Sequence, residues 1–94
     1  MTLKFFAYLR DAEFAGCKEM AWDTPAETVR VLGHQLSDRF GRRFHDEFFS
    51  PDESVLGERI IVMVNGRRSD FIGGIDAPLK PTDTVQIFPV VAGG

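Results

Sequence analysis

The chain has 94 residues, of which 44% are hydrophobic and 27% charged, with a formal net charge of −3 at pH 7. This length fits one domain over residues 1–94, and the mildly acidic balance argues against nucleic acid as the main partner. The single cysteine, Cys17, excludes an internal disulfide and a cysteine-rich zinc site.

No apolar run approaches the ~18–20 residues that a membrane span needs. The N-terminus also lacks the basic region, long apolar region and cleavage site of a signal peptide. We therefore expect a cytoplasmic protein with no membrane partner.

The N-terminal segment 3–9 is rich in aromatic residues, and polar and apolar side chains alternate along part of it. This pattern predicts a β-strand. One face of this strand would carry Leu3, Phe5, Ala7 and Leu9. The other face would carry Lys4, Phe6, Tyr8 and Arg10. A turn over 11–16 and a second strand over 17–22 would complete a hairpin.

A helix is predicted next, with its apolar stripe at Val29, Leu32, Leu36 and Phe40. Two starts are compatible with the sequence: residues 24–27 form a capping box, and Thr28 is a rival N-cap. We expect Gly41 to end the helix in a left-handed conformation. Over 42–58, the residues Phe44, Phe48 and Phe49 indicate a docked turn of helix, and 50–54 an exposed loop.

The C-terminal half predicts a strand at 59–64, covered on both faces because the run is continuously β-branched. Asn65-Gly66 is a tight-turn signal, followed by a short strand at 67–71 and a last strand at 84–88. Pro89 has no N–H to donate and should weaken further pairing.

This order of elements predicts a two-layer α+β domain, with one main helix on one face of a mixed sheet. The first and last strands would lie side by side at its centre. Their outer faces would carry Phe6, Tyr8 and Phe88, with Val90 following, and this uncovered apolar patch suggests a partner surface.

A search for catalytic or metal-binding groups favours ordinary structural roles, so we expect no catalytic residue and no metal site. We interpret His34 as a solvent-exposed residue of the helix. The acidic neighbours of His45 are adjacent to it in sequence, and adjacent residues on a helix do not point toward one metal ion. Cys17 has no nearby base in the sequence. Gly73-Gly74 lacks the spacing of a phosphate loop, and the acidic residues of 46–53 read as a solvated loop.

The C-terminal pair Gly93-Gly94 follows directly on a predicted core strand. Residues 91–94 reach at most ~13–14 Å when extended, and glycines can enter a narrow channel. This tether suits delivery of the Gly94 carboxyl group into another protein's active site. A carboxylate must first be activated, for example as an acyl-adenylate made from ATP, and nothing in the sequence could bind ATP. A separate activating enzyme is therefore implied, whereas the alternative is a frayed terminus.

Three stretches resemble the ubiquitin-like sulfur carriers of the MoaD/ThiS type over essentially the whole chain. They are Phe5-Phe6-Ala7-Tyr8-Leu9-Arg10, Val62-Met63-Val64-Asn65-Gly66 and the block from Pro78 to Gly94. The last is the most specific, because Pro-Leu, the Asp before the strand, Phe-Pro and Ala-Gly-Gly occur together and in order. The resemblance implies a β-grasp fold with a four- to five-stranded sheet.

The resemblance also implies a function without catalysis by this chain and without a bound cofactor. An adenylating enzyme of the ubiquitin-activating type would use ATP to activate Gly94, and a sulfur donor would convert it to a thiocarboxylate. The tail Val91, Ala92 and Gly93 would then enter an acceptor such as the large subunit of molybdopterin synthase. The implied partner-binding residues are Phe6, Arg10, Phe88, Pro89 and Val90.

Departures from the family pattern keep the pathway open. Molybdopterin carriers commonly end Phe-Pro-Pro-Val-x-Gly-Gly, and Val90 stands here in place of the second Pro. The ending and the loop 71–74 are also similar to those of carriers that serve cysteine biosynthesis. A thiamine carrier and a ubiquitin-like protein modifier are further alternatives.

Overall fold

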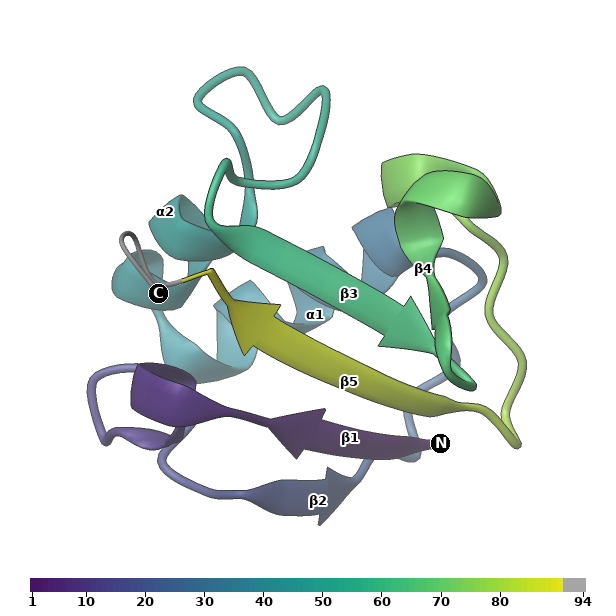
Figure 1. Cartoon of the computed structure of the whole chain (residues 1–94). Coiled ribbons are helices and arrows are strands. Elements are labelled where there is room, and N and C mark those ends of the chain that lie inside the picture. Colours follow the sequence, from purple (N-terminus) through teal and green to yellow (C-terminus); the bar gives the residue numbers. More distant parts are fainter. Residues whose placement is uncertain (91–94) are drawn as a thin grey trace.

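The computed structural model describes residues 1–90, and its centre is a five-stranded mixed sheet with the order β2-β1-β5-β3-β4 (Figure 1). Its strands are β1 (Thr2–Phe5), β2 (Glu19–Ala21), β3 (Ile60–Val64), β4 (Arg67–Arg68) and β5 (Thr84–Pro89). β1 and β5 run parallel, and the other neighbouring pairs are antiparallel. The predicted α+β architecture, with the first and last strands side by side, is confirmed.

Two helices, α1 (Val29–Phe40) and α2 (Arg42–Phe48), lie behind the sheet in Figure 1 and cover one of its faces. Of the two predicted starts, Thr28 is right, because its side-chain oxygen accepts a hydrogen bond from the Val31 N–H at 3.2 Å. Gly41 ends α1 at φ 103° and ψ −174°. The positive φ agrees with the sequence, whereas this ψ is extended and not that of a left-handed helix.

Burial alternates along β1, β3 and β5, so the sheet has one covered face and one open face. The covered face packs on the helices through fully or nearly fully buried side chains. The largest of these are Phe5, Phe44, Phe48, Leu3, Leu9, Leu32 and Leu36. The expectation that β3 is covered on both faces is wrong, since Ile61 and Met63 on its open face are only half-buried.

The predicted strand at 3–9 ends early, at Phe5, because Ala7 turns the backbone to a φ of 51°. A 3-10 helix, η1 (Ala7–Arg10), follows and buries Leu9 in the core. The Arg10 Nε donates to the Phe5 carbonyl at 2.8 Å, which stabilises this turn. The predicted strand at 67–71 is also shorter than expected, because the 3-10 helix η2 (Ser69–Phe71) replaces its second half; a further 3-10 helix, η3 (Gly74–Asp76), follows.

The Asn65-Gly66 turn is confirmed, with φ angles of 52° and 84°. The Asn65 amide donates to the buried Asp83 carboxylate at 2.8 Å and accepts from the Thr84 N–H at 2.9 Å. The other Asp83 oxygen accepts from the Lys80 N–H at 2.8 Å. The Asn turn and the Asp before the last strand therefore form one network, which ties the start of β5 to the end of β3.

Gly33 lets the two helices approach each other closely. It is buried in α1, and a Cβ built there would overlap the rings of Phe48 and Phe49. These two rings meet edge-on at 5.1 Å between centroids, as part of an aromatic cluster that includes Phe44. The absence of a Cβ at Gly33 therefore allows α2 and the Phe49 that follows it to pack closely against α1.

We expect Gly33→Ala to lower the free energy of unfolding by about 1–3 kcal/mol, because overpacking forces the rings to move. Helix propensity alone predicts the opposite sign, a gain of about 1 kcal/mol. Guanidinium unfolding followed by the fluorescence of Trp22 measures the difference. Val31→Ala, at an exposed position of the same helix, is the control and should change stability by only a few tenths of a kcal/mol. A Gly33→Ala variant as stable as the parent would contradict the packing argument.

Candidate functional site

The predicted tail residues Val91, Ala92, Gly93 and Gly94 lie outside the described residues, so the structure defines the surface from which they continue. β5 ends at Pro89, between β1 and β3, and the Val90 N–H then donates to the Arg59 carbonyl. β5 is thus paired on both sides up to Ile87, and its last residues and Val90 are held on the β3 side. The base of the tail, which we define as Val90 and its partner Arg59, is fixed on a rigid body.

An aromatic pair lies beside this base on the open face, the face turned toward the viewer in Figure 1. The rings of Phe6 and Phe88 are stacked at 4.2 Å between centroids, with 13° between their planes. The Arg10 guanidinium lies 5.3 Å from the centroid of the Phe6 ring, a cation–π contact. Ile61 stands opposite Phe88 in the register of β3 and β5. We call Phe6, Arg10, Ile61 and Phe88 the open-face patch.

The structure brings three of the five predicted partner-binding residues together in this patch: Phe6, Arg10 and Phe88. Val90 follows them at the base of the tail and is 44% exposed. Pro89 differs, because it is buried and faces the helix side opposite Ile60. Sequence reasoning missed Ile61, since the continuous apolar run of β3 gave no sign of which residues would stay uncovered.

Tyr8 is not on the open face, contrary to the alternation of the sequence. The turn at η1 rotates it toward α2, where its hydroxyl donates to the Glu47 carboxylate at 2.7 Å. The Arg59 Nε lies 3.9 Å from the same Glu47 oxygen. Burial, reinforced by the hydrogen bond to Glu47 and its negative charge, raises the pKa of Tyr8 to about 12. Glu47 thus links Tyr8 of η1 to Arg59, the residue whose carbonyl accepts from the Val90 N–H.

The two histidines, far apart in the sequence, meet at one carboxylate on the helix side. The Nε2 atoms of His34 and His45 lie 3.3 and 3.6 Å from the same Glu53 oxygen. The His45 Nδ1 lies 3.1 Å from the Asp46 carboxylate. Among residues 1–90, no three His, Cys, Asp or Glu side chains are placed so that they could hold a metal ion. We read the cluster as polar contacts that join α1, α2 and the loop after them.

Two further observations concern the described part of the chain. Cys17 is half-buried and packs against the core, the structural position that we expected for it. Neither α1 nor α2 has the length and apolar content that crossing a membrane requires.

A model of the ThiS family matches residues 3–94, which include the last strand and the Gly-Gly end. The chain belongs to the ThiS family. Among curated proteins it is similar to small archaeal modifier protein 3 of Haloferax volcanii, with 31% identity over all of this chain and 98% of that protein.

Solved structures of ThiS-like proteins share the fold. Small archaeal modifier protein 1 of Methanosarcina acetivorans is 30% identical, with a TM-score of 0.78 over 99% of this chain and 94% of that one. The BexX/CysO complex of Amycolatopsis orientalis contains a chain that is 29% identical, with a TM-score of 0.80 over 99% and 98%. A putative molybdopterin converting factor subunit 1 of Pyrococcus furiosus is 29% identical, with a TM-score of 0.66 over 96% and 95%.

These comparisons confirm the ubiquitin-like β-grasp fold and the predicted family. The protein is a ThiS/MoaD-type sulfur carrier or small modifier, and such proteins are non-catalytic.

The raised pKa of Tyr8 can be measured directly, because Tyr8 is the single tyrosine of the chain. Spectrophotometric titration of the folded protein should show the phenolate forming near pH 12 and not near 10. Because the folded pKa is raised, this stabilisation is fully present below about pH 10 and is lost as the pH rises through 12. Circular dichroism at each pH reports whether the fold persists.

Glu47→Gln should move the Tyr8 titration to lower pH, because the variant removes the negative charge that faces the phenolate. Glu58→Gln, at an exposed glutamate that makes no hydrogen bond to Tyr8, is the matched control and should leave the titration unchanged. A phenolate that forms near pH 10 in the folded parent would contradict the assignment.

Proposed function

We propose that this chain is a sulfur carrier whose Gly94 carboxylate is adenylated by a separate ATP-dependent enzyme and then converted to a thiocarboxylate. One observation supports this above the others. The ThiS family match extends to Gly94, five residues after the last residue of the central strand β5. Because β5 belongs to the sheet, the residues after it start from a fixed point beside the open-face patch.

The chemistry divides between the chain and its partners. The Gly94 carboxylate attacks the α-phosphate of ATP in the activating enzyme, which releases pyrophosphate and forms an acyl-adenylate. A sulfur nucleophile then displaces AMP and leaves a thiocarboxylate. This chain contributes the carboxyl group, a tail that ends in the small residues Ala92, Gly93 and Gly94, and the open-face patch. ATP and the catalytic groups belong to the partners.

We further propose the large subunit of molybdopterin synthase as the acceptor of the sulfur. The likeness to the putative molybdopterin converting factor subunit 1 of Pyrococcus furiosus supports this acceptor. The likeness to the chain in the BexX/CysO complex supports a complex with a partner enzyme, and it keeps an acceptor in cysteine biosynthesis as an alternative. A thiamine-pathway acceptor is the third alternative.

The carrier role is tested with the chain, ATP, a sulfur donor and an activating enzyme. We expect the mass of the C-terminal peptide to rise by the difference between one sulfur and one oxygen atom. Deletion of Gly93-Gly94 should abolish the gain, whereas Val31→Ala, exposed on α1, should keep it. A deletion variant that still supports sulfur transfer to an acceptor would overturn the proposal.

A protein modifier is the second candidate, favoured by 31% identity to one small archaeal modifier protein and 30% to another. In this role the activated Gly94 would form an amide with a lysine of a target protein. An Ala92→Arg variant makes the adducts traceable, since trypsin would then leave only Gly-Gly on the modified lysine.

We expect such remnants in a cell extract that contains ATP and the activating enzyme if the chain is a modifier. The same Ala92→Arg chain without Gly93-Gly94 should give none. Thiocarboxylate formation without any remnant would leave the carrier role and exclude the modifier role under those conditions.

A further inference from the structure

We propose that the protein that activates Gly94 also holds this chain at a second contact, a groove beside the base of the tail that Phe71 borders. This inference rests on the proposed activation of Gly94, and it adds a surface and a specificity-determining residue that neither the family match nor the sequence motifs assign. The groove adjoins the open-face patch on its β3 side, and the two surfaces share Ile61.

The groove has a volume of about 490 Å³ and opens beside the first half of β3. It exists because β4 is short and pairs only with Met63 and Val64, so no strand covers β3 before them. Its apolar lining comes from the loop before β3, from β3, from η3 and from the base of the tail: Val55, Leu56, Ile60, Ile61, Ile75 and Val90. Glu58, Arg68 and Asp70 also line it and supply charge. We call this the β3 groove.

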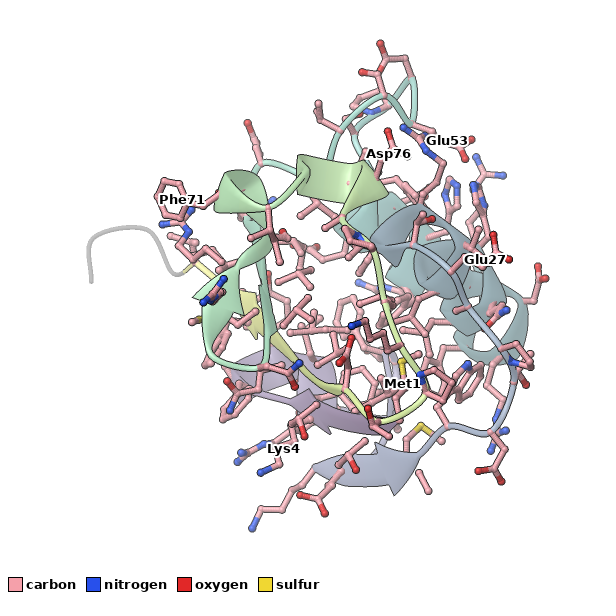
Figure 2. The ribbon with its side chains drawn as sticks, turned by 90° about the vertical axis from the view of Figure 1, so that its right-hand side faces the viewer. Met1, Lys4, Glu27, Glu53, Phe71 and Asp76 are labelled. Carbon is pink, nitrogen blue, oxygen red and sulfur yellow. The ribbon has the colours of Figure 1, made fainter. Side chains whose placement is uncertain are left out.

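Phe71 directly follows Asp70, which lines the β3 groove, and it is 82% exposed, an unusual state for a phenylalanine. In Figure 2 it projects on the same side as Lys4, a residue of the open face, whereas Glu27 and Glu53 project on the helix side. Phe71 is therefore directed to the side of the molecule where a protein that covers the open-face patch would lie.

The segment that carries Phe71 is held in place. Ser69 and Ile75 on either side of it are buried, and Arg68 pairs with Asp70 at 2.7 Å. Gly73 closes the turn at a φ of 127°, with its backbone against Ala77. The backbone that carries Phe71 is thus already ordered, so a partner has only the side chain of Phe71 to order on binding.

The exposed apolar side chains are not scattered over the surface. Of the four large ones among residues 1–90, Val55 and Val90 line the β3 groove and Phe71 borders it; the fourth, Val31, lies on α1. Single exposed apolar residues need no explanation, but a cluster of them around a groove indicates a protein contact.

Val90 connects this cluster to the tail. A protein that closes around residues 91–94 must also cover Val90, and Val90 lines the β3 groove. Activation of the carboxyl group is the one step that every proposed fate of Gly94 shares. We therefore assign the groove to the activating protein, which would place an aliphatic or aromatic side chain in it and pack against Phe71.

The test is steady-state adenylation of the parent and of Phe71→Ala, measured as ATP–pyrophosphate exchange with the chain as varied substrate. Burial of one phenylalanine side chain contributes enough that the KM for the variant should rise about 10- to 100-fold. The kcat should stay within about twofold, because the reacting carboxyl group is unchanged. Phe71→Leu should restore part of the loss, and Val55→Ser, on the opposite wall, should also raise KM.

Val31→Ala is the matched control, since it removes an exposed apolar side chain that does not line the groove and should leave KM unchanged. Thermal unfolding of each variant shows that the fold is intact, which we expect because Phe71 and Val55 are exposed.

Three outcomes would overturn the inference. An unchanged KM for Phe71→Ala with an active parent would remove the contact and leave the proposed function standing. A loss confined to transfer of sulfur to the acceptor would assign the groove to the acceptor instead. A parent that shows no exchange at all would overturn the proposed function, and the contact with it.

Discussion

The parallel pairing of β1 with β5 joins the two ends of the described chain at the centre of the sheet, and the open-face patch depends on it. The pairing sets Phe5 beside Ile87 and so brings Phe6 to Phe88. Because β3 pairs with the other side of β5, the strand that leads to the tail has hydrogen-bonded neighbours on both sides. Without this pairing, the aromatic pair and the base of the tail would not share one surface.

The two faces of the sheet have different roles. The covered face holds the packed aromatic residues of β1, α1 and α2, where Gly33 leaves room for Phe48 and Phe49. The open face keeps Phe6, Phe88 and Ile61 without a covering helix. Both helices lie on the covered face, so the apolar side chains of the open face have no helix packed against them.

Much of the fold could be predicted from the sequence because its signals are local. The helical stripe from Val29 to Phe40, the positive φ angles of Asn65-Gly66 and the β-branched strand before them need only neighbouring residues for their interpretation. The predictions were wrong where contacts between residues far apart in the sequence decide the local structure. Alternation predicted a strand through Leu9, but the core takes up Leu9 only after the backbone turns at Ala7, and this turn sends Tyr8 to Glu47 on α2.

By itself, the sequence determined the class of fold, the order of its elements and the family, because periodicity, turn residues and the C-terminal block are written along the chain. Alternation along the first and last strands also placed Phe6 and Phe88 on the open face, but only the tertiary structure decided the exposure of the other apolar residues. Exposure depends on what packs against a residue: Pro89 is buried by the helix side, while Phe71 is left exposed by the turn of η2. The groove beside β3 likewise follows from the shortness of β4, which no local pattern in 67–71 revealed.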